Sequence, residues 1–165
     1  MTLTILNQQL NIWNTNLEIK HSIVDKIYQL KEHDVGSKKS NRGGWQSTSF
    51  FYDSPEYQWL YNSIDLKNIQ IDGIEYLIYN SWFNINSSGH SNKWHNHGHR
   101  PFVGVLYIDV PNNSGGIEFQ INQDNFFHQP STGEFLMFPG YLQHRVSENL
   151  SNKDRISLAI NFKKM

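Results

Sequence analysis

Histidine is the residue type in this chain whose spacing most clearly suggests chemistry: there are eight, and three stand within five positions. His95 and His97 are two residues apart, so on an extended strand both imidazoles point to the same side and can share a metal ion. His144 is the best candidate for a third ligand, because it follows a predicted strand and turn that a closed barrel could bring against the pair. Neutral imidazole binds iron, zinc, copper and nickel alike, so the ligand type alone does not select the metal. Three other histidines are predicted to be solvated or structural: His90, His99 and His128.

Arg155 is the second chemical candidate, eleven residues after His144. A guanidinium on the polar face of a barrel strand keeps its proton and therefore needs an anionic partner. Its planar fork suits a carboxylate, and the Ser157 hydroxyl on the same face could add a hydrogen bond. Two kinds of partner remain open at this point: a carboxylate ligand, or an internal salt bridge to Asp109 or Glu118.

The second half of the chain is predicted to consist of short strands with period-two alternation, which would position these side chains. The predicted strands are YLIYNSWFNIN, FVGVLYIDV, GIEFQI, EFLMFPG and RISLAINF. In the last one, a polar face alternates with an apolar face that consists of Ile156, Leu158, Ile160 and Phe162. In the first one, Asn80, Trp82 and Asn84 alternate with Tyr79, Phe83 and Ile85. One apolar and one polar face are what a ligand-holding barrel requires.

The first third of the chain is predicted to be helical. Apolar residues at helical spacing indicate a helix over about residues 17–33, and Ser54-Pro55 begins a second one that ends near Asp65. The polar loop between them, Lys38 to Ser49, is a candidate lid or substrate strap; the alternative is a surface loop pinned by Trp45 in the core. Helices followed by many strands predict a mainly β fold with N-terminal helices packed on one face of a barrel or sandwich.

Length and composition narrow the class of protein. The 165 residues predict a single domain, 1–165, with a helical support over about 17–66 and a β-barrel over about 75–163. The absence of cysteine excludes disulfides, thiolate nucleophiles and cysteine-rich zinc folds. A net charge of −1 disfavours long duplex DNA as a partner, and no apolar run approaches a membrane span. We therefore expect a soluble, cytoplasmic protein.

The order of motifs resembles the iron(II)- and 2-oxoglutarate-dependent oxygenases. After the histidine pair come Gly-Gly-x-x-Phe, Gly-x-x-x-x-Phe-Pro, a distal histidine and Arg-x-Ser. Within that superfamily, the chain is most similar to a small, prolyl-hydroxylase-like group often found in phages. The motifs shared with that group are Gly43 to Ser47, Trp82, Asn92 and Gly104, and the match runs from about residue 43 to 162.

The resemblance implies a double-stranded β-helix, a jelly-roll or cupin-like barrel, with Fe(II) at its open end. The implied metal ligands are His95, His97 and His144. The implied residues around 2-oxoglutarate are Arg155 on its distal carboxylate, Ser157 and Tyr107 assisting, and Asn80, Trp82 and Asn84 lining the cavity. The implied activity is that of a dioxygenase that uses O2 to hydroxylate a C–H bond and releases succinate and CO2. A peptide or protein is the first expectation for the prime substrate, by analogy of fold.

The chain departs from the superfamily at His97, where aspartate or glutamate is usual, so Asp109 or another carboxylate is an alternative second ligand. Two other functions remain open. A three-histidine cupin-type metalloenzyme would not use 2-oxoglutarate and would pair Arg155 internally. A non-catalytic β-barrel binding module would keep its histidines as structural residues and would retain no stoichiometric metal.

Overall fold

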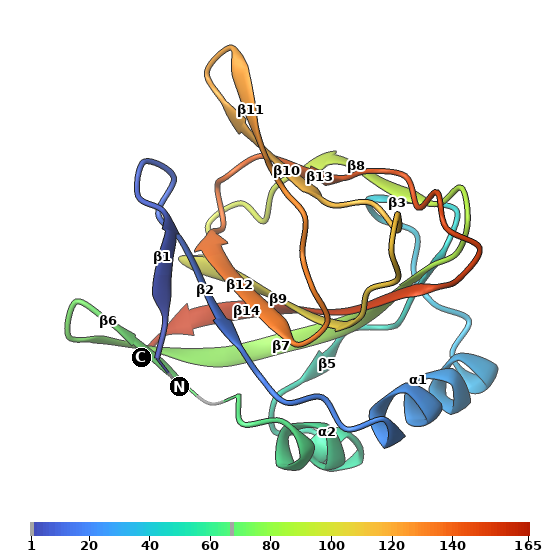
Figure 1. The fold of residues 1–165 in the computed structure, drawn as a ribbon. Helices are drawn as coiled ribbons and strands as arrows, with labels where there is room; N and C mark the ends of the chain where they lie inside the picture. Colours follow the sequence, from blue (N-terminus) through green and yellow to red (C-terminus); the bar gives the residue numbers. More distant parts are fainter. Residues whose placement is uncertain (1, 67) are drawn as a thin grey trace.

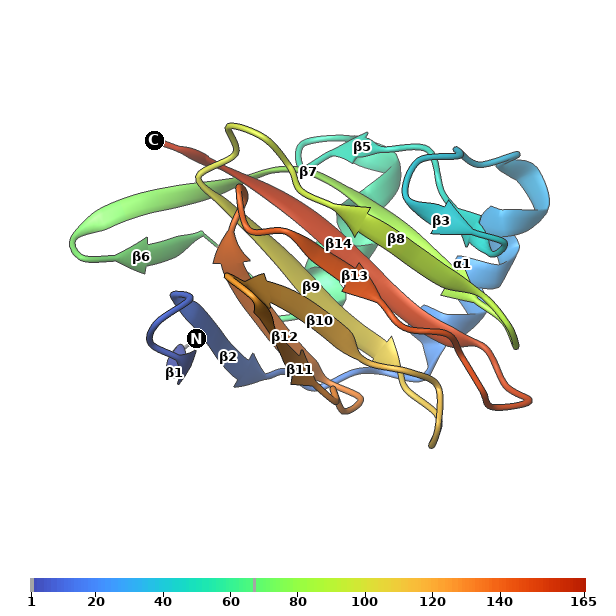
Figure 2. The same cartoon turned by 90° about the horizontal axis from the view of Figure 1, so that it is seen from above.

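The computed structural model describes residues 2–66 and 68–165, in which two antiparallel sheets face one another (Figure 1). The larger, nine-stranded sheet runs in the order β1 (Thr4–Asn7), β2 (Ile12–Asn16), β12 (Glu134–Pro139), β9 (Phe102–Asp109), β14 (Arg155–Lys164), β7 (Ile74–Asn86) and β4 (Trp45–Gln46). Two more strands also pair with β7: β5 (Phe50–Phe51) and β6 (Ile69–Ile71). The smaller sheet runs in the order β11 (Asp124–His128), β10 (Ile117–Ile121), β13 (His144–Val146), β8 (Ser91–His95) and β3 (Asn41–Arg42). The predicted β-helix architecture is confirmed, and Figure 2 shows the smaller sheet lying over the larger one.

Two α-helices lie beneath the larger sheet, α1 (Ser22–His33) and α2 (Gln58–Ser63), the second preceded by a 3-10 turn η1 (Pro55–Tyr57) (Figure 1). They are shorter than the sequence predicts, and β1 and β2 precede them, so the helices are not strictly N-terminal. The first helix begins later than expected because the Leu17 amide donates a hydrogen bond to the Gly133 carbonyl, which ties that segment to the sheet. Pro55 stands at the start of the turn before α2, as its fixed φ favours.

The core consists of two apolar layers separated by the larger sheet. Side chains on its outer face, among them Phe83, Leu158 and Phe162, are fully buried together with Ile23 and Ile27 of α1. A second layer lies between the sheets and contains Phe119, Leu136 and Phe138. The predicted alternation in β14 is confirmed: its apolar residues pack toward the helices, which leaves the opposite face of the strand for the interior between the sheets.

Residues 37–49, which we call the strap, connect the two sheets along one side. Within the strap, β3 pairs with β8 of the smaller sheet and β4 pairs with β7 of the larger one. Gly43 and Gly44, both at φ 67°, make the turn between them. A Cβ on Gly44 would lie 2.9 Å from the Ile85 carbonyl oxygen, so this position requires glycine. Trp45 packs against the core and donates to the Asp34 carbonyl, so the strap is both pinned and close to the interior.

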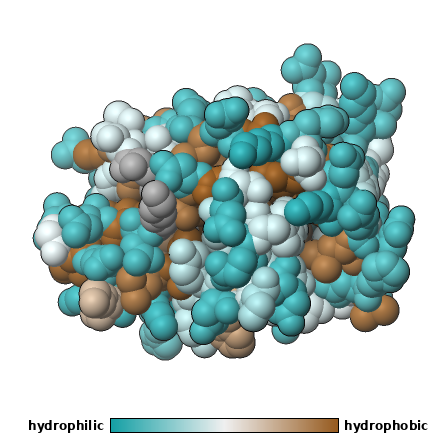
Figure 3. Space-filling view, turned by 90° about the horizontal axis from the view of Figure 1, so that it is seen from below, coloured by the Kyte–Doolittle hydropathy of each residue, from teal (hydrophilic) through white to brown (hydrophobic). Residues whose placement is uncertain are grey.

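The face that carries the helices mixes hydrophilic and apolar residues (Figure 3). Within the part of the chain that the structure describes, none of the helices has the length and apolar character to cross a membrane.

Candidate metal centre and its cavity

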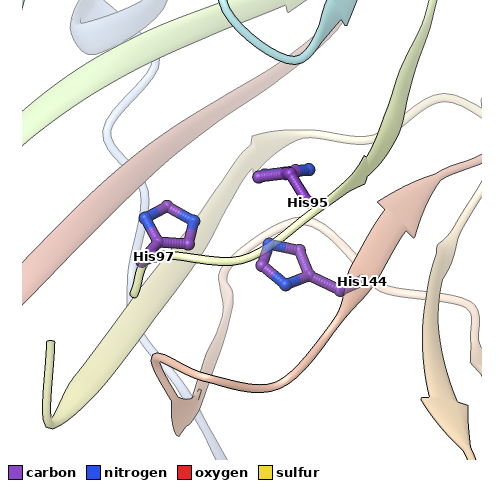
Figure 4. A group of neighbouring side chains, drawn as sticks. All are labelled: His95, His97 and His144. Atoms are coloured by element: carbon purple, nitrogen blue, oxygen red, sulfur yellow. The ribbon is translucent and has the colours of Figure 1, made fainter. Parts of the chain in front are cut away.

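Three histidines from two distant parts of the chain converge on one point. His95 ends β8 and His144 begins β13, where the two residues are register partners, while His97 lies two residues beyond β8. Their potential ligand atoms all lie within 4.8 Å of one another. Ring centroids are 4.3 Å apart for His95 and His144 and 5.3 Å apart for His97 and His144 (Figure 4). The structure thus brings together the three histidines that the sequence singles out.

Hydrogen bonds leave one nitrogen of each ring available to a metal. Every Nδ1 faces a carbonyl oxygen, which can only accept, so Nδ1 must carry the proton and Nε2 keeps its lone pair. The acceptors are the backbone oxygens of Lys93 (2.7 Å from His95) and Leu142 (2.8 Å from His144), and Oδ1 of Asn161 (3.1 Å from His97). Partners of this kind orient metal-ligating imidazoles and raise their basicity.

All three imidazoles are held in their neutral form. Burial, reinforced by the charge of His95, lowers the pKa of His97 to about 4 and that of His144 to about 3. Burial also lowers the pKa of His95, and the nearby charge of Lys93 contributes. Neutral imidazole is the form that binds metals, so no proton has to be displaced near pH 7.

The donor set fits a divalent transition metal. Three neutral nitrogen donors suit iron and leave further coordination positions for exogenous ligands. Within the described residues, the cluster of metal-ligating side chains contains no carboxylate. Asp109, the alternative second ligand, is exposed at the end of β9 and does not belong to this cluster.

A cavity of about 530 Å³ adjoins the histidines, enclosed by the two sheets and the strap. It is lined by all nine predicted site residues: His95, His97, His144, Arg155, Ser157, Tyr107, Asn80, Trp82 and Asn84. Its apolar lining comes from Val103, Val105, Ile117, Val146 and Ala159. Concave sites with an apolar wall and a few polar groups are typical of small-molecule binding.

Arg155 is 3% exposed, lines this cavity, and has no carboxylate within ion-pair distance among the described residues. Its Nη1 donates to the Ser114 carbonyl at 2.8 Å. Among the described residues, Arg155 does not form the internal salt bridge to Asp109 or Glu118 that the sequence left open. Glu118 pairs with Arg145 at 2.9 Å, and Asp109 is exposed. Burial lowers the pKa of the guanidinium from its usual value, and Tyr107 opposes that shift. A buried cation of this kind calls for an anionic ligand.

Tyr107 and Ser157 lie beside this guanidinium. They are register partners on β9 and β14, and Ser157 is also the partner of Asn84 on β7. Tyr107 is 3% exposed, and burial raises its pKa far above its usual value, so the phenol stays protonated. Each can donate an O–H hydrogen bond to a carboxylate held by Arg155.

A hydrogen-bonded chain that the sequence did not reveal connects His97 to the strap. Asn161, which accepts from His97, donates through Nδ2 to Oδ1 of Asn80 at 3.0 Å, and Asn80 donates to Oγ of Ser49. Trp82 stacks on the His97 ring with centroids 5.6 Å apart and 20° between planes. The only sequence signal for Asn161 is its place on the polar face of β14.

Comparison with known proteins finds a family match over one segment of the chain. Residues 118–161 match the model of a protein family described as "Putative 2OG-Fe(II) oxygenase", a stretch that includes His144, Arg155 and Ser157. No curated protein matches the sequence.

The solved structures with similar folds include oxygenases. A prolyl hydroxylase from Trichoplax adhaerens, solved with a hypoxia inducible factor peptide fragment, is 14% identical, with TM-score 0.67 and coverage of 93% of this chain and 83% of that one. A Pseudomonas putida prolyl-4-hydroxylase is 12% identical, with TM-score 0.61 and coverage of 92% of both chains. A 2OG-Fe(II) oxygenase family member from Burkholderia pseudomallei is 17% identical, with TM-score 0.50. The match covers 54% of this chain and only 44% of the length of that protein.

At these identities the solved structures establish a shared fold only. The family match covers the segment that carries His144 and the Arg-x-Ser motif. They support the resemblance to the 2OG-Fe(II) oxygenases that the motif order indicates. Fe(II) and 2-oxoglutarate are the groups that the matched family's description names, and His95, His97 and His144 could hold a metal ion.

Proposed function

We propose that this protein is an Fe(II)- and 2-oxoglutarate-dependent dioxygenase that hydroxylates a C–H bond of a peptidyl or small-molecule substrate. The observation that carries the proposal is Arg155, a buried guanidinium without a carboxylate partner among the described residues, in the same cavity as three neutral histidines. Leaving such a charge uncompensated is costly, and a dicarboxylate co-substrate would supply the missing counter-charge.

In this proposal, His95, His97 and His144 hold the iron through Nε2. Bound together, iron, 2-oxoglutarate and O2 supply the oxidising chemistry, in which the keto acid leaves as succinate and CO2 and one oxygen atom enters the substrate C–H bond. Arg155 binds the distal carboxylate with its planar fork, and the hydroxyls of Ser157 and Tyr107 donate to the same group.

The remaining lining residues orient and shield the reactants. Trp82 packs on His97, so it holds that ring in place. Val103, Val105, Ile117 and Val146 line the cavity with apolar surface. Such surface excludes water from the reacting groups and strengthens the electrostatic contacts to them.

A peptide is the substrate class that we favour, and the Trichoplax neighbour that was solved with a peptide fragment supports this choice.

We further infer that the chain forms a single domain, because β2 near the start pairs with β12 in the sheet that also holds β14. The cytoplasmic location stays a prediction.

The alternatives have less support. The three-histidine cupin-type enzyme predicts that Arg155 forms an internal salt bridge. Instead, its one hydrogen bond to protein among the described residues goes to the backbone oxygen of Ser114. The non-catalytic module predicts structural histidines, whereas no Nε2 of these rings has a hydrogen bond among the described residues, and the rings' potential ligand atoms lie within 4.8 Å of one another.

Isothermal titration of 2-oxoglutarate into Co(II)-loaded protein tests the proposal without turnover. We expect one saturable site whose affinity falls by more than about 100-fold in Arg155→Ala, since a buried carboxylate loses its charged partner. Arg145→Ala is the matched control, because that guanidinium pairs with Glu118 and does not line the cavity. Equal affinity in wild type and Arg155→Ala would contradict the proposal.

A further inference from the structure

The lining of the site cavity carries charge of one sign. Among the described residues that line it, Lys39, Lys93 and Arg155 are charged at pH 7, and none is aspartate or glutamate, although the chain has 15 acidic residues. The lining histidines are neutral, as described above. The cavity is therefore a region of positive potential in a protein whose net charge is −1.

The two lysines lie next to each other at the edge of the cavity, away from the buried Arg155. Lys39 belongs to the strap just before β3, and Lys93 belongs to β8, which pairs with β3. The Lys93 amide donates to the Ser40 carbonyl at 2.9 Å, which places Lys93 beside the residue that follows Lys39. Both residues are exposed, and neither forms an ion pair with a described residue.

The co-substrate does not account for these two charges. The charge of the 2-oxoglutarate dianion is equal in magnitude and opposite in sign to that of a divalent metal, and the buried Arg155 would receive its distal carboxylate. The ammonium groups of Lys39 and Lys93 therefore remain available to a group that enters from solvent. Their position at the rim would let them attract an anion and fix its orientation.

An unused pair of amides lines the same cavity. Gln46 of the strap and Asn84 of β7 are register partners, and neither side-chain amide has a hydrogen bond within the described structure. Gln46 is 8% exposed, so its donor and acceptor are largely withdrawn from water. A primary amide matches the N–H and C=O of a peptide group.

We propose that the prime substrate is an acidic peptide segment whose carboxylates are held by Lys39 and Lys93 at the cavity mouth. This inference rests on the proposed function and names the substrate of that same site. The unused amides of Gln46 and Asn84 can pair with the N–H and C=O groups of a peptide backbone. Two rim lysines are too few for a phosphate backbone, which is bound by an extended run of cations.

A randomised peptide pool tests the proposal. Immobilised protein carrying Fe(II) and 2-oxoglutarate under argon is incubated with octapeptides in which glutamate, glutamine and lysine are equally frequent, and the retained peptides are sequenced. We expect glutamate to be enriched over glutamine by about tenfold, the effect of two partly exposed charge pairs. The enrichment is lost in the double variant Lys39→Gln/Lys93→Gln.

Lys38→Gln is the matched control, because Lys38 is an exposed neighbour that does not line the cavity, and it keeps the enrichment. Equal retention of glutamate and glutamine, no retained peptide, or enrichment that survives in the double variant would each overturn the proposal. Tighter binding of a single-stranded oligothymidylate than of the acidic peptides would overturn it in favour of a nucleic acid. The Fe(II)–2-oxoglutarate absorbance of the same samples reports separately on the proposed function.

Discussion

At the scale of single residues, the candidate metal centre depends on how each imidazole is held. The spacing of His95 and His97 predicts two imidazoles on one side of a strand, yet β8 ends at His95. His97 therefore owes its orientation to Asn161 and Trp82 rather than to strand geometry. An asparagine shows no such role until the fold brings it to a histidine 64 positions away.

His144→Ala is expected to abolish metal retention. His144 is 3% exposed and is one of three candidate nitrogen donors. Its loss should weaken metal binding by more than about 100-fold, which exceeds the effect of losing a residue that only orients a ligand. The measurement is metal content after gel filtration, with the exposed His99→Ala as control. Stoichiometric iron in His144→Ala would place the metal elsewhere.

Asn161→Ala is expected to weaken metal binding by about 10–100-fold, because His97 loses the acceptor that fixes its tautomer. Asn86→Ala is the control, since Asn86 lines the same cavity but donates to Asn92 instead of holding a histidine. A Co(II) titration followed by the ligand-field spectrum separates an altered metal environment from a simple loss of stability. Identical metal affinities in the two variants would refute a positioning role for Asn161.

His97→Asp is expected to keep the metal, because it supplies the carboxylate that is usual in the superfamily at this position. His97→Leu, which offers no donor, should lose it. Metal content and Co(II) affinity measure both variants. If the two variants bind equally well, His97 is not a ligand.

At the scale of elements, the polar and apolar faces of β7 and β14 follow from the sequence alone. Their alternation assigns Phe83 and Leu158 to the core and Arg155 to the interior of the barrel, and the structure agrees. The same signal is weak where a strand is short or faces water on one side. For that reason β2, with the sequence IWNTN, and the three-residue β13 were not predicted.

The hairpin β10–β11 is joined to the larger sheet through a buried carboxylate. Oε1 of Glu134 accepts from His128 Nε2 at 2.8 Å and from Asn14 at 3.1 Å, and Oε2 accepts from the Ser131 amide. Burial by itself would raise the pKa of Glu134, but these hydrogen bonds outweigh it and hold the pKa below the usual 4.5.

The pKa of Glu134 is lower in the folded state than in the unfolded state. The ionised Glu134 therefore stabilises the fold at pH values above the unfolded-state pKa, and this stabilisation is lost as the pH falls through the folded-state pKa. The free energy of unfolding, from urea titrations, should therefore fall between about pH 5 and pH 3. Glu134→Gln should remove part of this slope and cost about 1–3 kcal/mol at pH 7. The exposed Glu148→Gln should do neither; an unchanged slope in Glu134→Gln would contradict the assignment.

At the scale of the whole molecule, the candidate site exists because distant segments close around one cavity. The three candidate metal ligands come from β8, β13 and the segment after β8, Arg155 comes from β14, and the strap joins the two sheets beside them. Motif order predicted most of these residues. The sequence made Lys38 to Ser49 a candidate strap, but it could not predict that Gln46, Lys39 and Lys93 line the cavity, because their approach depends on how the strap crosses between the sheets.

An anaerobic titration of Fe(II)-loaded protein with 2-oxoglutarate, followed by visible absorbance, tests the central claim most directly. A keto acid that chelates iron through two atoms gives a charge-transfer band. We predict a saturable band that is lost in Arg155→Ala and retained in Arg145→Ala. Stoichiometric iron binding without any band would contradict the account and favour a three-histidine enzyme that does not use 2-oxoglutarate.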